Sequence, residues 1–135
     1  MKKINWHSPQ EIYYYAYNNT GFKPRPFRSQ GTFQKYSSID DKIDDLHFYT
    51  QFIKFGFGRA TVDSCIEIRR GSMEREQALS LIKIYDGKFP YEFLQLYLDY
   101  FKMNKKKFIK VLFKHTDKSL FRIKNDKIIP KVDLA

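Results

Sequence analysis

The chain has 135 residues and a formal net charge of +10, the size of one domain with a single core and a charge that favours anionic partners. Hydrophobic residues make up 42% and aromatic residues 18%, so we expect a globular fold with an aromatic-rich core. The single cysteine, Cys65, excludes an internal disulfide and a multi-cysteine zinc site. No leader and no apolar run of membrane-spanning length is evident, so we expect a cytoplasmic protein without a membrane partner.

The chain opens with a short helix and a long loop. Ser8 and Pro9 predict the start of the helix and Gly21 predicts its end. This helix is apolar on most sides and rich in tyrosine, so we expect its neighbour to lie outside the chain. Residues 18–38 lack a sustained period, which predicts a loop. Its candidate contacts for a substrate or nucleotide are Arg25, Arg28, Lys35 and Tyr36. The alternative is a covering loop whose arginines bind carbonyl groups or water.

A buried helix over residues 40–55 is the central element, because its apolar residues recur near a helical period. Its opening turn is acidic and complements the helix dipole, or alternatively binds Mg²⁺ that carries a nucleotide. The carboxylates concerned are Asp40, Asp41, Asp44 and Asp45. His47 has no second histidine or cysteine at ligand spacing, so we interpret it as structural.

A joint of two glycines, Gly56 and Gly58, ends this helix. Both glycines are free to adopt positive φ, which breaks a helix and lets a backbone or ligand approach. We expect Thr61 to be the N-cap of the next helix, with Asp63 in the first turn. Lys54 and Arg59 then flank the joint, which predicts an anion-binding site.

Four further segments predict helices that form a bundle with short loops. The first contains Val62, Cys65, Ile66 and Ile68, ends at Gly71, and makes Cys65 a small core residue. The second is capped by Ser72 or Glu74 and ends at Asp86-Gly87, the third starts at Pro90, and the fourth is capped by Asn104. The tail favours a small hairpin with its turn at Asn125-Asp126, and Pro130 and the terminal residues are expected to be frayed.

The expected fold is therefore mainly α, a bundle of about five to six helices with a long early loop and a small C-terminal hairpin. Residues 1–39 form an N-terminal helix and loop, residues 40–115 a helical domain, and residues 116–135 a basic tail. We expect residues 1–39 to link to a nucleotide-binding domain outside this chain.

Motifs along the chain resemble, in the same order, the C-terminal part of bacterial N-acetyl sugar amidotransferases, a branch of the PP-loop or N-type ATP pyrophosphatase family. The upstream matches are Trp6, Pro9, Tyr14-Tyr15, Thr20-Gly21-Phe22, Gly31-Thr32, Lys35-Tyr36, Ser38 and Asp40-Asp41-Lys42. The downstream matches are Lys54-Phe55-Gly56-Phe57-Gly58-Arg59-Ala60-Thr61, Asp63, Glu67-Ile68-Arg69, Gly71, Arg75-Glu76 and Tyr85-Asp86-Gly87. The resemblance extends to about Phe108.

The resemblance implies an enzyme that adenylates the N-acetyl group of a sugar with ATP and replaces the acyl oxygen with ammonia. The product is an acetamidino sugar for lipopolysaccharide, O-antigen or another surface polysaccharide. ATP, Mg²⁺, a nucleotide-linked N-acetyl sugar and a glutaminase subunit are implied with it. The family's Ser-Gly-Gly-x-Asp-Ser loop, which holds the pyrophosphate, is not found in this chain. We therefore expect a separate N-terminal ATP-binding domain or subunit and no activity of the chain alone.

On this interpretation Lys54 and Arg59 stabilise phosphate charge, and the alternative is a structural ion pair with Asp63 or Glu67. The full set of phosphate or substrate candidates is Lys54, Gly56, Gly58, Arg59, Lys42, Arg28 and Arg69. No catalytic residue and no metal ligand is assigned. A basic helical module that binds nucleic acid or another protein through the late lysines is the alternative function, and no helix-turn-helix, ribbon or zinc signature supports it.

Overall fold

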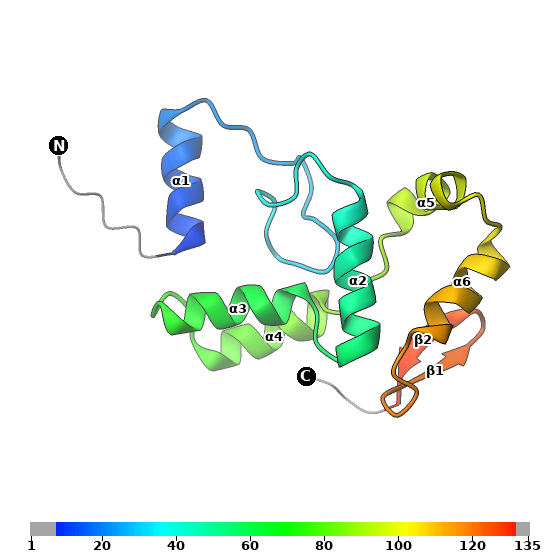
Figure 1. The fold of residues 1–135 in the computed structure, drawn as a ribbon. Helices are drawn as coiled ribbons and strands as arrows, with labels where there is room; N and C mark the ends of the chain where they lie inside the picture. Colours follow the sequence, from blue (N-terminus) through cyan, green and yellow to red (C-terminus); the bar gives the residue numbers. More distant parts are fainter. Residues whose placement is uncertain (1–7, 132–135) are drawn as a thin grey trace.

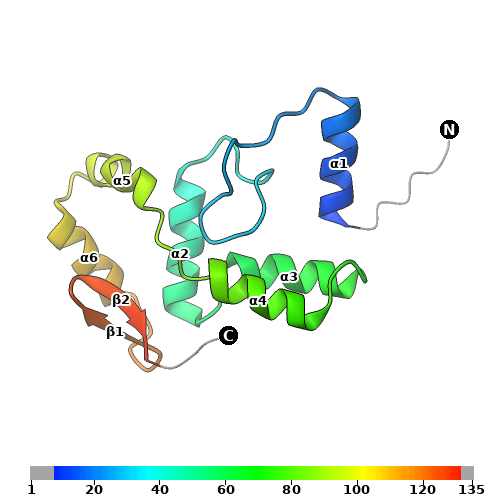
Figure 2. The same ribbon diagram turned by 180° about the vertical axis from the view of Figure 1, so that it is seen from behind.

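The structure, a computed structural model, describes residues 8–131. Within this range the chain is mainly α-helical, as expected, with one small antiparallel sheet (Figure 1 and Figure 2). The elements are α1 (Pro9–Asn19), α2 (Ile43–Phe55), α3 (Arg59–Arg69), α4 (Arg75–Tyr85), a 3-10 turn η1 (Tyr91–Phe93), α5 (Leu94–Phe101), α6 (Lys105–Lys114), β1 (Phe121–Lys124) and β2 (Lys127–Pro130). No helix of residues 8–131 has both the length and the apolar character needed to cross a membrane.

Helix α1 begins as its sequence predicts. The Ser8 hydroxyl accepts the Glu11 N–H at 3.2 Å, and the Glu11 carboxylate accepts the Ser8 N–H at 3.1 Å. This reciprocal pair satisfies two N–H groups that the helix itself leaves free. None of the helix residues is buried, and its Tyr13 ring stacks on Tyr36 with centroids 4.7 Å apart. In Figures 1 and 2, α1 stands apart from α2, α5 and α6.

The central helix α2 begins at Ile43, three residues later than predicted. The reason is that Asp41 lies outside the helix and its carboxylate accepts the Ile43 N–H at 2.7 Å. Inside the first turn, Asp45 is 1% exposed and pairs with Arg25 of the loop at 3.0 Å. The acidic opening therefore caps the helix and anchors the loop.

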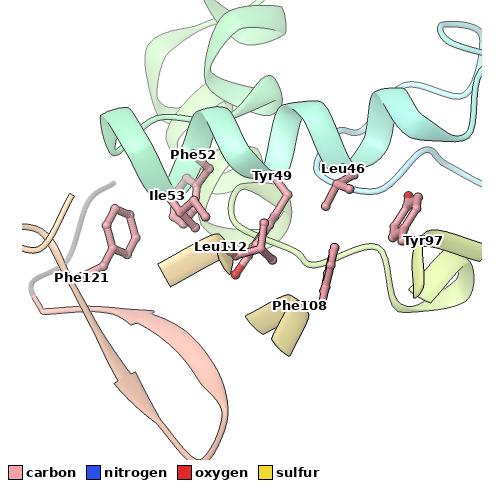
Figure 3. Close-up of a cluster of buried hydrophobic side chains, with 8 residues drawn as sticks. All are labelled: Leu46, Tyr49, Phe52, Ile53, Tyr97, Phe108, Leu112 and Phe121. Carbon is pink, nitrogen blue, oxygen red and sulfur yellow. The ribbon is translucent and has the colours of Figure 1, made fainter. Parts of the chain in front are cut away.

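One face of α2 carries half of the hydrophobic core, which Figure 3 shows. Leu46, Tyr49, Phe52 and Ile53 of α2 meet Tyr97 of α5, Phe108 and Leu112 of α6, and Phe121 of β1. Five of these eight side chains are aromatic, so the prediction of an aromatic-rich core is confirmed. Phe52 and Phe121 contact edge to face at 5.2 Å and 70°, a favoured arrangement for two rings.

The tail forms the predicted hairpin. Strand β1 pairs antiparallel with β2, and Asn125 and Asp126 make the turn with φ of 50° and 55°. Pro130 was expected to be frayed, but it ends β2 opposite Phe121. The expectation was wrong because Phe121 is 1% exposed and holds the hairpin against the core. The terminal residues 132–135 lie outside the described range.

Helices α3 and α4 lie side by side in both ribbon views. The burial of α3 is the reverse of the prediction, because Cys65 is exposed while Ser64 and Glu67 are buried. Small side chains explain this orientation. Ala60 and Ser64 of α3 and Ala78 of α4 are at most 2% exposed, and such residues let two helices approach closely. Cys65 is therefore a surface residue, and its assignment to the core was wrong.

The ends of the later helices agree with their sequence signals. Gly71 follows α3 with φ of +75°, and Gly87 follows α4 with φ of +73°. Of the two proposed caps of α4, Glu74 is the one used, in a capping box with Gln77. Asn104 caps α6 by accepting the Lys107 N–H at 2.9 Å.

Candidate functional site

The glycine joint uses its two glycines in different ways. Gly56 ends α2 in the left-handed conformation, with φ of +80°, as predicted. Gly58 has an extended backbone with φ of −111°, so the expectation of positive φ there was wrong. Glycine is required at this position for space, since a Cβ atom on Gly58 would lie 2.6 Å from Oδ1 of Asp86.

The carboxylate of Asp86 caps the start of α3. It accepts the N–H groups of Gly58 at 2.9 Å, Ala60 at 2.8 Å and Thr61 at 3.4 Å, and the Thr61 hydroxyl at 2.5 Å. Helix α3 therefore starts at Arg59 with Gly58 as N-cap, and the prediction that Thr61 is the N-cap was wrong. The group that these donors bind is therefore a carboxylate of the chain itself. These backbone donors are thus already in use and are not free for a phosphate.

Arg59 lies in the interior and is 5% exposed. Its Nε atom is 3.8 Å from Oδ2 of Asp63, and its guanidinium carbon lies 4.2 Å from the centroid of the Phe48 ring. The predicted alternative, an ion pair with Asp63, is therefore present. Nη1 of Arg59 is buried without a hydrogen-bond partner in the described chain, so one donor of this cation remains available.

Several polar side chains surround Arg59, and we call them the Arg59 cluster. Its members are Thr32, Tyr36, Arg59, Asp63 and Glu67. The Thr32 hydroxyl donates to Asp63 at 2.5 Å. The hydroxyl of Tyr36 and both carboxylate oxygens of Glu67 are buried without partners among the described residues. Unsatisfied buried polar atoms are uncommon, which makes the cluster a candidate site in its own right.

Burial shifts the pKa values of two members of the cluster, Asp63 and Tyr36. It raises the pKa of Asp63 above the usual value of 3.8, and the Thr32 hydrogen bond and the charge of Arg59 oppose that rise. Burial also raises the pKa of Tyr36, and the negative charges of Glu67 and Asp63 raise it further. The spacing of Arg59, Asp63 and Glu67 at intervals of four indicates one helix face, whereas no sequence signal links Thr32 to that face.

Lys54 has different surroundings from Arg59. It is exposed in the last turn of α2, with Nζ 5.1 Å from the centroid of the Phe55 ring. It also lines a groove of about 600 Å³ between α2 and α6. The joint therefore separates its two flanking cations, one exposed at the groove and the other buried in the Arg59 cluster.

The remaining candidates are dispersed. Arg28 donates from Nε to the Phe33 carbonyl at 3.0 Å, and Arg69 donates to the Cys65 carbonyl at 3.2 Å. Lys42 is exposed, with Nζ 5.7 Å from the Phe93 ring centroid.

Loop residue Arg25 donates to the Ser38 carbonyl and pairs with Asp45. Arg25 and Arg28 thus behave as the covering-loop alternative predicts. Across residues 8–131, no group of three or more His, Cys, Asp or Glu side chains is arranged to hold a metal ion.

Helices α2 to α6 and the hairpin lie within a match to a known domain of lipopolysaccharide biosynthesis proteins. Residues 30–133 match the family described as LPS biosynthesis protein WbpG-like, C-terminal domain. The match covers most of the chain, which therefore belongs to this family. It extends beyond Phe108 through the hairpin and begins after α1. A comparison with curated proteins gives no match.

Proposed function

We propose that this chain is the C-terminal part of an ATP-dependent N-acetyl sugar amidotransferase that makes acetamidino sugars for lipopolysaccharide. Membership in the WbpG-like C-terminal domain family carries the proposal, because that family belongs to lipopolysaccharide biosynthesis. The amidotransferase motifs described above supply the reaction class. The proposed place of action is the cytoplasm, where ATP and nucleotide-linked sugars are available.

The proposed reaction has two displacement steps. The acyl oxygen of the acetamido group attacks the α-phosphate of ATP, pyrophosphate leaves, and the nitrogen loses its proton to give an O-adenylyl imidate. Ammonia then adds to the imidate carbon, and AMP leaves with the former acyl oxygen. The first step needs fixed donors and cations that stabilise the leaving pyrophosphate, with Mg²⁺ as the usual companion of the nucleotide.

Those donors are best supplied by another domain or subunit. The one glycine-flanked helix start described above is filled by Asp86, so its N–H groups do not form a phosphate cradle. We therefore propose that a domain with the Ser-Gly-Gly-x-Asp-Ser loop binds ATP and that a glutaminase subunit provides ammonia. The chain alone is then inactive.

Helix α1 is the proposed contact with the ATP-binding domain. Tyr14 and Tyr17 are each 55% exposed and Ile12 is 44% exposed, although all three are large and largely apolar. Such a surface is typical of an interaction site. The helix also precedes the matched family domain in the sequence, which supports this proposed contact.

Within this proposal the two cations of the joint have different roles. Lys54 is exposed and is therefore suited to direct contact with a phosphate. Arg59 is buried against Asp63, so we assign it the positioning of the Arg59 cluster. Gly56 and Gly58 shape the joint, and Lys42, Arg28 and Arg69 are exposed cations that stay candidates for substrate contact.

The test is reconstitution. The chain, the Ser-Gly-Gly-x-Asp-Ser domain from the same genome, or both are mixed with ATP, Mg²⁺, an ammonium salt and a UDP-linked N-acetyl sugar. Mass spectrometry then detects replacement of the acyl oxygen by an imino group. Product from the mixture alone supports the proposal, and no product under any condition contradicts it. Lys54→Gln should reduce turnover, whereas Lys110→Gln, a matched change of another exposed lysine, should not.

The alternative function rests on the exposed lysines of α6, at positions 105, 106, 107, 110 and 114. Nucleic-acid binding through these side chains would weaken steeply with added salt because counterions are released on binding. A titration with single-stranded and duplex oligonucleotides at two salt concentrations separates this function from the enzymatic one.

A further inference from the structure

The groove between α2 and α6 has the size and walls of a small-molecule site. Its volume of about 600 Å³ lies in the usual range of about 300–1,000 Å³ for such sites. Ile53 and Leu112, which are 2% and 8% exposed, belong both to the core and to the groove, so they form a floor that packing holds in place. Phe55, Phe57 and Val111 add apolar walls.

Two exposed phenylalanines form one of these walls. The rings of Phe55 and Phe57 stack with centroids 6.1 Å apart and an interplanar angle of 28°. Phe55 is 55% exposed and Phe57 is 43% exposed, so a paired aromatic surface faces solvent next to the glycine joint. A surface of this kind suits a planar ring, because stacking on an aromatic side chain requires no particular hydrogen bonds.

The charge of the groove has one sign. Its ionisable lining residues are Lys54 and His47 of α2 and His115, which follows α6. Of the described residues that line the groove, none is acidic. His47, Thr50, Gln51 and Lys54 recur at intervals of three and four, so a single face of α2 presents its hydrogen-bonding groups to the groove. The matching ligand is an anion that also carries an aromatic ring.

We propose that this groove binds a nucleotide, with its base against Phe55 and Phe57 and its phosphates at Lys54. The aromatic wall and the charge of the groove indicate, by themselves, a ligand that is an anion with an aromatic ring. The choice of a uridine nucleotide rests on the proposed function, whose sugar substrate is linked to one. The site deepens that function by giving this chain its own part in substrate binding, separate from the ATP site of the partner domain.

The test uses the chain of 135 residues with UDP as the probe. Uridine and inorganic pyrophosphate, which represent the two halves of UDP, are the comparison ligands. UDP should shift the amide NMR signals of residues 47–57 and 111–115. In calorimetry UDP should bind more tightly than either half and less tightly as salt is added, because ions screen exposed charges. Confinement of the shifts to these two segments identifies the groove.

Two variants test the two contacts. Phe57→Ala should weaken UDP binding about tenfold, because the loss of one stacking contact between a base and an aromatic ring lowers affinity by about tenfold or more. Lys54→Gln should weaken it about fivefold, the scale of an exposed charge pair. Tyr100→Ala and Lys110→Gln change an exposed ring and an exposed lysine outside the groove and should bind as the parent chain does. Thermal unfolding confirms that each variant is folded.

Three results would overturn the site: no shifts at millimolar UDP, shifts along the α6 lysines in place of the groove, or equal binding of UDP and one of its halves. None of them bears on the amidotransferase activity, which the reconstituted mixture reports separately. Turnover without UDP binding to this chain rejects the groove site alone. UDP binding without turnover keeps the site and rejects the enzymatic proposal.

Discussion

The two sides of α2 are held together by different forces. On one side, α5, α6 and the hairpin pack an aromatic core against it. On the other, the loop and α3 are held by polar contacts, of which Arg25 to Asp45, Thr32 to Asp63 and Asp86 to the start of α3 are the main ones. Hydrogen bonds fix both distances and directions, whereas apolar contacts are non-directional. The polar contacts therefore hold the Arg59 cluster in a specified geometry, whereas the groove between α2 and α6 lies on the apolar side.

Several buried polar atoms on the polar side also lack hydrogen-bond partners. Oδ1 of Asp45, Nη1 of Arg59 and both oxygens of Glu67 are buried without partners in the described chain. An unsatisfied buried group costs about 1–3 kcal/mol. Among the described residues, no unpartnered buried atom belongs to α5, α6 or the hairpin, and the buried hydroxyls of Tyr97 and Thr116 donate to the carbonyls of Lys42 at 2.8 Å and Leu112 at 2.9 Å. Function is thus expected to constrain the polar side more than stability does.

The largest effect is expected from breaking the apolar side. Phe121→Ala removes a ring that is 1% exposed and contacts Phe52, which should lower the free energy of unfolding by about 3–5 kcal/mol. Urea denaturation gives the value. The matched control is Tyr100→Ala, which removes a ring that is 69% exposed. This change should lower the free energy of unfolding by less than about 0.5 kcal/mol. A small effect of Phe121→Ala would mean that the hairpin is not part of the core.

The next effect concerns the hydrogen bonds from the start of α3 to the Asp86 carboxylate, which we call the Asp86 clamp. Asp86→Ala removes four hydrogen bonds to the start of the helix, and we expect a loss of about 2–3 kcal/mol in stability. Asp86→Asn keeps a carbonyl oxygen as an acceptor and should recover part of it. Equal losses in the two variants would show that charge and not hydrogen bonding holds the helix. Urea denaturation again provides the measurement.

A third experiment uses pH. Burial raises the pKa of Asp63 in the folded chain above its usual 3.8, so the folded state holds the proton more tightly than the unfolded state. The free energy of unfolding should therefore fall as pH rises from the unfolded-state pKa to the raised folded-state pKa, and then level off. Asp63→Asn should lack this fall, so its stability relative to the parent improves with pH over that window. Parallel stability curves would contradict the assignment.

Thr32→Val sharpens the same test. The Thr32 hydroxyl donates to Asp63 and lowers its pKa, so removal of this donor should raise the pKa further. NMR titration of the Asp63 carboxyl measures the direction. A lower pKa in the variant would mean that the hydroxyl accepts in place of donating.

The smallest effect tests the reversed burial of α3. Because Cys65 is exposed, Cys65→Ser should change stability by less than about 0.5 kcal/mol. A maleimide should also label the thiol of the folded parent without prior unfolding. Slow labelling together with a large loss of stability would show that Cys65 is a buried core residue.

The sequence predicted what is determined locally and missed what distant residues determine. Ser8, Asn104 and Gly71 mark helix ends through contacts within a few residues, so their signals are readable. The Asp86 clamp joins residues 28 positions apart, and no local pattern reports it. For the same reason α3 was assigned the wrong buried face, because the close packing of Ala60 and Ser64 overrides the preference for burying larger apolar residues.

The candidate site was predictable to a similar degree. The helix end at Gly56 and the ion pair of Arg59 with Asp63 could be read from the sequence, because each depends on residues within one segment. The partition of Lys54 and Arg59 between a groove and the interior was not foreseen. It depends on where α6 and the loop fold back onto α2, which periodicity does not encode.

The Asp86 clamp also determines how the protein can be divided. A cut between residues 61 and 86 leaves the backbone donors at the start of α3 on one piece and their carboxylate acceptor on the other. Each piece then lacks the hydrogen-bond partner of the polar groups that the cut exposes. The segment from Gly58 to Asp86 thus behaves as one indivisible module, and fusion junctions, cleavage sites or split reporters belong outside it.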